Sequence, residues 1–259
     1  MILAGDTVRI AKDAEELMRD AAEVFATEAS DVAGVGGLFT VALAGGSTPH
    51  GLYTLLAGEP AFRARVPWTR IHFFWGDERH VPPHHPESNY RLAHETMLSR
   101  VGVPEDHIHR IRTELPDAAA AADAYEETLR ELAAPRRPRP LFDLVLLGMG
   151  SDGHTASLFP GTDGLRSTTR LVVAHWVDRL GAHRITLTVP ALCSAVHVVF
   201  LVSGADKAAT LRDVLMAEAP TEALPASLIR PIRGGRLTWL VDQDAARLLE
   251  PPHLRGISP

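Results

Sequence analysis

The stretch FDLVLLGMGSDGHTASLFP, from Phe142 to Pro160, decides the expected fold and marks its candidate site. Residues 142–147 are apolar except for one aspartate, a pattern typical of a buried strand. Glycines at positions 148 and 150 then loosen the backbone, and Asp152 and His154 bring an acid and an imidazole close together. Residues 155–157 are expected to begin a short helix. Because ligands of open parallel sheets bind beyond the carboxyl ends of strands, this stretch is predicted to carry chemistry.

Strand-like and helix-like segments alternate along most of the chain. This alternation predicts an α/β fold with a doubly wound, mainly parallel, Rossmann-like sheet. The predicted strands are 38–44, 71–75, 142–147, 171–176, 185–189, 196–202 and 237–241. The predicted helices are 13–30, 47–56, 88–100, 116–133 (followed by a proline-rich turn at 135–140), 205–217 and 243–249. Residues 160–189 hold strands with little helix between them, so we expect a small antiparallel appendage within a single domain, 1–259.

Three further predicted strand ends are rich in glycine and polar residues, at 45–48, 76–79 and 203–207. Parallel strands bring such ends to one edge of a sheet, so these loops and 148–154 are expected to converge on one cleft. Residues 77–79 (DER) could alternatively form a solvated charged turn with no part in a site.

The segment 45–48 (GGST) is predicted to bind an anion. We expect Ser47 to cap the following helix and Pro49 to take its first position. Free backbone N–H groups and the helix dipole favour a phosphate there, but the dipole contributes only about 0.3–1 kcal/mol, so cations are needed as well. The predicted phosphate-binding set is Gly45, Gly46, Ser47, Thr48, Arg79, Arg184 and Lys207. An ordinary strand–turn–helix cap remains the alternative for the GGST motif.

His154 is the candidate acid–base residue. A histidine titrates near neutrality and can act first as base and then as acid, typically contributing about 10²–10⁴-fold in rate. Asp152 is expected to orient the ring, although Asp77 stays open as a second candidate. A helix-start histidine bonded to nearby backbone is the structural alternative. The glycines at 148, 150 and 153 also match a dinucleotide fingerprint, but Pro160-Gly161 would end the following helix too early for that motif.

Composition restricts the classes of protein that fit. Hydrophobic residues make up 46% of the 259 residues and charged residues 22%, ordinary values for a globular protein. The net charge of −6 argues against nucleic-acid binding, and no apolar run reaches the roughly 18 residues of a membrane span. The single cysteine, Cys193, is predicted to be a buried thiol, which fits a reducing, cytoplasmic setting. Histidines 80, 84 and 85 lie in a proline-rich loop and are interpreted as solvated rather than metal-binding.

Taken together, these motifs resemble the 6-phosphogluconolactonase family, which is itself similar to glucosamine-6-phosphate deaminases and isomerases. The residues that carry the resemblance are LAGGSTP (43–49), WGDERHVPP (75–83), SN (88–89), LLGMGSDGHTASLFPG (146–161), RITLT (184–188), SGADKA (203–208) and PASLI (225–229). They follow the family's order and span nearly the whole chain. The central motif with its HTASLFP ending is highly specific, whereas GGSTP is shared with the deaminases.

The resemblance implies hydrolysis of 6-phospho-D-glucono-1,5-lactone, the second step of the oxidative pentose phosphate pathway, without a metal or an organic cofactor. By motif position, His154 corresponds to the catalytic histidine, and Arg79, Arg184 and Lys207 to residues that hold phosphate and sugar hydroxyls. The expected partner is a small sugar-phosphate lactone, with no nucleic acid and no membrane, and the expected state is a monomer or weak homo-oligomer. Two rivals stay open: an isomerase or deaminase with Asp77 as carboxylate base, and a non-catalytic sugar-phosphate sensor.

Overall fold

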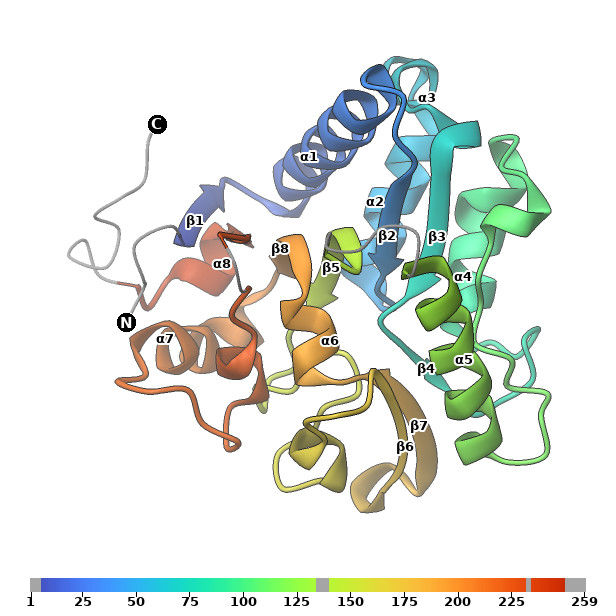
Figure 1. Ribbon diagram of the computed structural model, residues 1–259. Helices are drawn as coiled ribbons and strands as arrows, with labels where there is room; N and C mark the ends of the chain where they lie inside the picture. The colour runs from blue at the N-terminus through green and yellow to red at the C-terminus, as the bar shows by residue number, and fades with distance from the viewer. Residues whose placement is uncertain (1–5, 134–139, 232–233, 250–259) are drawn as a thin grey trace.

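The computed structural model describes residues 6–133, 140–231 and 234–249, which form a central parallel sheet flanked by helices (Figure 1). The sheet has six strands in the order β1-β9-β8-β5-β2-β3, and every neighbouring pair is parallel. Its strands are β1 (Asp6–Ala11), β2 (Phe39–Leu43), β3 (Ile71–Trp75), β5 (Phe142–Gly148), β8 (Ala195–Val202) and β9 (Arg236–Asp242). A second, antiparallel sheet has the order β4-β7-β6, with β4 (Asp77–Arg79), β6 (Val172–Val177) and β7 (Ala182–Leu187).

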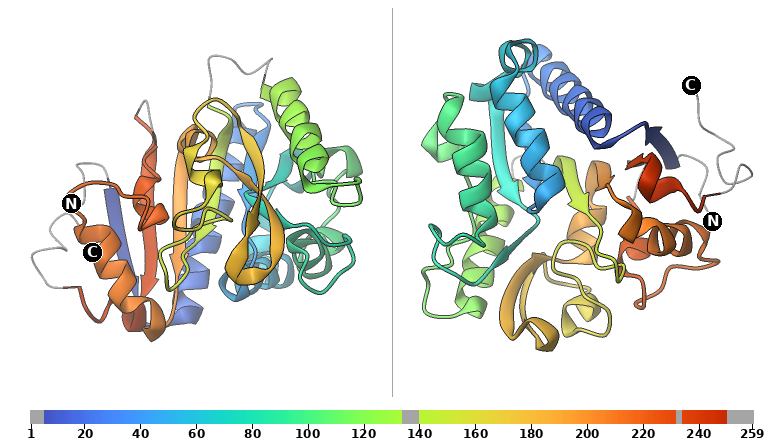
Figure 2. Two further views of the ribbon diagram at one scale, coloured as in Figure 1. Left: turned by 90° about the horizontal axis from the view of Figure 1, so that it is seen from below. Right: turned by 180° about the vertical axis from the view of Figure 1, so that it is seen from behind.

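The helices lie on both sides of the central sheet. They are α1 (Ala14–Gly34), α2 (Ser47–Gly58), α3 (Pro60–Arg65), α4 (Asn89–Thr96), α5 (Ala118–Ala133), α6 (Val189–Cys193), α7 (Ala208–Met216) and α8 (Gln243–Ala246). Helices α1 and α2 lie side by side behind the sheet in Figure 1, and α5 lies toward its other face (Figure 2). The predicted doubly wound α/β fold with an antiparallel appendage is therefore confirmed.

The central strands form because their side chains are apolar on both faces, as a sheet covered on two sides requires. Every residue of β2 is buried, and so are most residues of β5. Asp143 is the acidic exception in β5, and its Oδ2 accepts hydrogen bonds from the backbone N and the hydroxyl of Thr40, at 2.8 and 2.9 Å. The carboxylate thus ties β5 to β2 at the start of the strand pair.

The strand order reverses between β2 and β5. From β2 the chain moves outward to β3, whereas from β5 it moves the other way, to β8 and β9. Ligands of open α/β sheets bind in the crevice beyond the strand ends at such a reversal. The small sheet lies beyond the arrowheads of β2 and β5 in Figure 1, beside that crevice.

Several local predictions need correction. Strand β1 was not predicted; it pairs only with β9 and so lies at the edge of the sheet. No helix begins at 155–157, because Thr155 and Leu158 instead form an isolated antiparallel bridge within a run of turns. Residues 77–79 form the third strand of the appendage rather than a solvated turn. The proline-rich turn predicted at 135–140 lies outside the described residues except for its last residue.

The structure gives two further findings, one on membrane-spanning helices and one on metal ligands. Within the ranges that the structure describes, no helix is long and apolar enough to cross a bilayer. In the same ranges no three or more His, Cys, Asp or Glu side chains are grouped as metal ligands would be.

Cys193 is buried as predicted, and its Sγ lies 3.2 Å from the backbone N of Arg230, which donates to it. Burial raises the pKa of this thiol, which suits a structural role.

Candidate active site

A cavity of about 250 Å³ opens at the strand-order reversal. Its lining comes from the loops after β2 and β5, from β4, from the start of α4 and from the 3₁₀ turn that precedes α7. The lining residues are Ala44, Gly45, Gly46, Asp77, Arg79, Asn89, Gly148, Met149, Gly150, His154, Ala156 and Lys207. A second cavity shares Gly46, Arg79 and Asn89 with the first and adds Ser47 and His50. The predicted convergence of the four strand ends is therefore present, whereas Thr48 and Arg184 are not among the residues that line these two cavities.

The pair Asp152–His154 lies on the irregular loop after β5. The Nδ1 of His154 is 2.5 Å from Oδ1 of Asp152, and this oxygen also accepts the backbone N–H of His154 at 3.2 Å. The ring lies against Phe159, with 4.3 Å between centroids. Because Asp152 is an acceptor, Nδ1 carries the shared proton and Nε2 is left as the free, basic nitrogen.

Glycines make this loop possible. A Cβ at Gly150 would lie 2.0 Å from Nδ1 of His154 and 2.5 Å from Oδ1 of Asp152, so only a glycine leaves room for the pair. Gly153 has a φ of +80°, a left-handed conformation that favours glycine. The Thr155 hydroxyl closes the loop by donating to the carbonyl of Gly148 at 2.8 Å.

Charges around the ring determine its protonation. Burial is the main cause that lowers the pKa of His154, the nearby Arg179 lowers it further, and Asp152 and Asp77 oppose them. Burial would raise the pKa of Asp152, but the hydrogen bond from His154 and the charge of Arg179 outweigh burial and lower it. The imidazole is therefore neutral and the carboxylate ionised near pH 7, the state required of a general base.

Asp77, the other candidate for orienting His154, bonds elsewhere. Its Oδ2 accepts from the hydroxyl of Ser157 at 2.6 Å, and its Oδ1 accepts from Nδ2 of Asn89 at 3.2 Å. The residue is 8% exposed. The strand pairing of β4 with β7 buries it, which a local reading of the acidic triplet does not reveal.

Glu78, next to Asp77, connects β4 to the start of α4. Its carboxylate accepts from the backbone N–H groups of Arg79, Asn89 and Tyr90, each at 2.8 Å, and from the hydroxyl of Ser88 at 3.0 Å. Burial raises the pKa of Glu78, and the three backbone donors act against that rise. The side chain thereby holds the strand that carries Asp77 and Arg79 against the helix.

The glycine turn after β2 differs from the prediction in one respect. Gly46, with a φ of +106°, is the N-cap of α2, and no side chain caps the helix; Ser47 is its first residue and Pro49 its third. The predicted Ser47 cap is therefore wrong. The first backbone N–H groups of α2 are left without a side-chain acceptor, which is the condition for binding an anion at a helix start. Gly45 is required because a Cβ there would lie 1.8 Å from Oδ1 of Asn89.

Two cations, Arg79 and Lys207, line the cavity that this turn also lines, and a third, Arg184, lies beside Arg79. Arg79 lies opposite Arg184 in the β4–β7 register, and its Nη1 donates to the carbonyl of Glu87 at 2.6 Å. Burial, and next the charge of Arg79, lower the pKa of Arg184. Lys207 pairs with Asp206 at 3.0 Å and lines the same cavity as His154. Adjacent like charges repel, so an anion bound between them would relieve the repulsion.

Two residues of this region, Arg179 and Asn89, are not among the predicted site residues. Asn89 stands inside a quoted motif, SN at 88–89, which is the signal that could have found it. Arg179 stands in the 3₁₀ turn Asp178–Leu180 between β6 and β7, and nothing in the local pattern sets it apart from a surface arginine. Only the return of that turn to the loop after β5 brings it to Asp152.

The chain is similar to known proteins along most of its length. The family model described as glucosamine-6-phosphate isomerases/6-phosphogluconolactonase matches residues 12–239. A 6-phosphogluconolactonase of Synechocystis sp. is 44% identical, over 82% of this chain and 85% of its own length. One of Nostoc sp. is 40% identical, over 92% and 96%. The solved structure of the 6-phosphogluconolactonase from Trypanosoma cruzi is 31% identical and superposes with a TM-score of 0.80, covering 94% of this chain and 97% of that one.

Proposed function

This chain belongs to the glucosamine-6-phosphate isomerase/6-phosphogluconolactonase family, and from that premise we propose that it hydrolyses 6-phospho-D-glucono-1,5-lactone to 6-phospho-D-gluconate. That reaction belongs to the oxidative pentose phosphate pathway. The observation that carries the proposal is the Asp152–His154 pair beside a cavity that also holds Arg79 and Lys207. A neutral base next to two cations suits a substrate that combines an ester carbonyl with a phosphate.

In the proposed reaction, the free Nε2 of His154 takes a proton from a water molecule as the water attacks C1 of the lactone. The C1 carbonyl oxygen becomes an oxyanion, and each preorganised donor that it meets can be worth about 3 kcal/mol. The imidazolium then gives its proton to the ring oxygen as the C1–O bond breaks, which regenerates neutral His154. A δ-lactone is an activated ester, so one positioned base suffices without a covalent nucleophile, a metal or an organic cofactor.

The phosphate of the substrate is proposed to lie at the start of α2, with Arg79 and Lys207 as its cationic partners. Support comes from the uncapped N–H groups behind Gly46 and from the two cavities that meet at Gly46 and Arg79. Charge-assisted hydrogen bonds of this kind are roughly twice as strong as neutral ones. Binding the phosphate there would hold the lactone ring toward the loop after β5.

The nearest rival is ring opening followed by deamination or isomerisation, with Asp77 as the carboxylate base. Both oxygens of Asp77 already accept hydrogen bonds, from Ser157 and Asn89, which hold its carboxylate in place. His154, in contrast, keeps one free nitrogen. These contacts favour hydrolysis over proton abstraction by a carboxylate.

The test compares lactone loss with the protein against an enzyme-free control, because the lactone also hydrolyses unaided. We expect strong acceleration by the wild type and a loss of about 10²–10⁴-fold in kcat for His154→Ala. His183→Ala, which removes an exposed histidine from β7, is the matched control and should stay within about twofold of the wild type. Near-normal turnover by His154→Ala would refute the mechanism.

Two further outcomes would refute the activity itself. Release of ammonia from glucosamine 6-phosphate at a rate above that of lactone loss would assign the chain to the deaminase side of the family. Binding of 6-phosphogluconate with no acceleration of lactone loss would indicate a non-catalytic sensor.

A further inference from the structure

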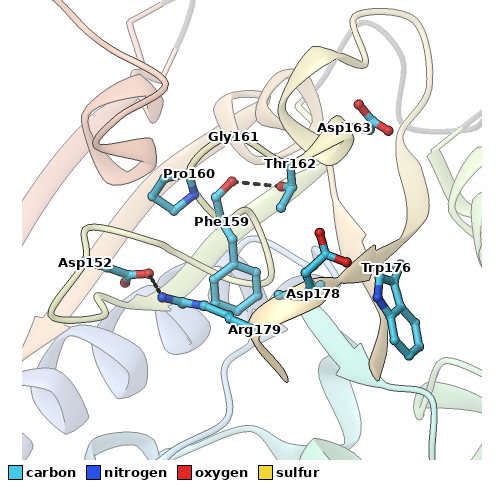
Figure 3. Close-up of a pocket in the computed structure, with 10 residues that line it drawn as sticks. Asp152, Phe159, Pro160, Gly161, Thr162, Asp163, Trp176, Asp178 and Arg179 are labelled. Carbon is cyan, nitrogen blue, oxygen red and sulfur yellow. Dashed lines mark hydrogen bonds and ion pairs between the residues drawn. The ribbon is translucent and has the colours of Figure 1, made fainter. Parts of the chain in front are cut away.

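Arg179 makes contacts that the proposed reaction has not yet used. It belongs to the turn between β6 and β7, more than twenty residues away in sequence from the loop after β5. Its Nη1 forms an ion pair with Oδ2 of Asp152, and its guanidinium lies 4.5 Å from the ring centroid of Phe159 (Figure 3). The same Phe159 ring packs against His154. Arg179 therefore touches both of the residues that hold the imidazole in place.

The carboxylate of Asp152 is shared between two partners, one for each oxygen. Oδ1 faces Nδ1 of His154, and Oδ2 faces Arg179. The Nη2 of Arg179 is also 3.5 Å from Nδ1 of His154. Because Nδ1 already gives its proton to Asp152, it cannot accept a second bond, and this approach is a contact between a cation and the ring rather than a hydrogen bond.

This arrangement restricts how Asp152 can move. A carboxylate held through one oxygen only can rotate about its side-chain torsions. Asp152 is held through both, by a hydrogen bond at Oδ1 and an ion pair at Oδ2, which restricts that rotation. Residues that orient a catalytic group in this way often affect turnover without touching the substrate.

We propose that Arg179 is a positioning residue: it fixes the Asp152 carboxylate so that His154 holds its ring with Nε2 free for the reaction. The inference rests on the proposed function, because it assigns Arg179 a part in the same hydrolysis. Arg179 is not placed against the substrate, since it lines a different cavity, of about 470 Å³, together with Asp152 and Phe159.

The charges that face His154 decide how its protonation responds. Asp152 faces it from the loop after β5, Arg179 from the β6–β7 turn and Asp77 from β4. Lys207 and Arg79 share its cavity. Burial still lowers the pKa of His154 when the charge of Arg179 is removed, but one of the charges that disfavour a protonated imidazole is gone, which raises that pKa.

The test uses Arg179→Met and Arg179→Gln, which remove the charge, and Arg179→Lys, which keeps it. Lysine can replace a single ion pair, and the contact to Asp152 is made through one guanidinium nitrogen. Arg166→Met is the matched control, because Arg166 is an exposed arginine of the same region that pairs with Asp163 at 3.0 Å. For each variant, kcat and KM are measured from pH 5 to 9 against enzyme-free blanks.

For Arg179→Met and Arg179→Gln we expect kcat at pH 7 to fall about tenfold with KM within about twofold, since the substrate is not touched. The acidic limb of the kcat profile should move upward by about one pH unit. Arg179→Lys should keep most of the wild-type kcat and most of the wild-type position of the acidic limb. Arg166→Met should match the wild type in both. A rise in KM alone would show substrate binding instead of positioning, and an unmoved acidic limb would also overturn the proposal.

A second readout separates this inference from the proposed activity. Ring signals of His154 in isotope-labelled protein, titrated by NMR, report its protonation without any substrate. An upward shift of the His154 midpoint in Arg179→Met supports the inference even if the wild type fails to accelerate lactone loss. A midpoint unchanged from the wild type in both uncharged variants overturns it, whatever the activity.

Discussion

Gly150→Ala offers a sharp test of how closely the site is built. The new methyl carbon would lie 2.0 Å from Nδ1 and 2.2 Å from Cε1 of His154, and 2.5 Å from Oδ1 of Asp152. Ordinary contact begins near 3.4 Å, so the ring must move away from the methyl by more than an ångström and the carboxylate by slightly less than one. Misplacing a reacting group by about 1 Å can cost about 100-fold in rate, which equals about 2.7 kcal/mol of lost transition-state stabilisation.

The assay measures kcat for the phosphorylated lactone, with near-ultraviolet circular dichroism and Tm confirming that the variant is folded. Gly76→Ala is the matched control, because its Cβ would meet only the Leu43 carbonyl at 3.6 Å and a Leu147 methyl at 4.0 Å, both ordinary contacts. It should keep kcat within about twofold of the wild type. A folded Gly150→Ala with wild-type kcat would refute the claim that the close approach of His154 and Asp152 matters for turnover.

Three more predictions follow from burial and charge. Glu78→Gln places an amide N–H₂ among four donors and should lower the free energy of unfolding in urea by about 2–4 kcal/mol, whereas the exposed Glu222→Gln should change it by less than about 0.5 kcal/mol. Lys207→Met should raise KM for the phosphorylated lactone about 10–100-fold, because a cation that binds the phosphate is lost. Turnover of glucono-1,5-lactone, which has no phosphate, should be unchanged. Equal losses on both substrates would contradict the proposal that Lys207 binds the phosphate. Burial, and next the neighbouring histidines, lower the pKa of His109 in the folded protein to about 4. As the pH drops from about 6.5 to 4, the unfolded state takes up a proton at this residue before the folded state does. The free energy of unfolding should therefore fall by about 1–2 kcal/mol over that range. His109→Gln should flatten that slope in urea titrations, and a slope equal to that of the wild type would assign it to other groups.

Much of the fold could be predicted from local pattern alone. The runs that became β2, β3, β5 and β8 are apolar almost throughout, and such runs have few alternatives to a buried strand in a chain that alternates strand and helix. Because parallel strands end at one edge, the sequence also implied that the loops after β2 and β5 meet. The position of His154 in the loop after β5, at this edge of the sheet, follows from the same rule.

The remaining features depend on contacts between distant segments. The triplet at 77–79 has the composition of a solvated turn, yet pairing with β7 buries Asp77 and Glu78. Strand β1 gives no strong local signal because it is a short edge strand, and only β9 defines its position.

By itself, the sequence determined the layer architecture and pointed to the edge of the sheet at which the candidate site lies and to its candidate histidine, since these depend on hydrophobic periodicity and on turn residues close in the chain. Tertiary structure alone decided which carboxylate holds His154 and which cation holds that carboxylate. In sequence, Asp152 is the expected partner and Asp77 stays open as a second candidate. The folded loop brings Asp152 to Nδ1, while Ser157 and Asn89 bond to Asp77. Arg179 reaches Asp152 because the β6–β7 turn folds back over Phe159, a contact that no spacing between neighbouring residues encodes.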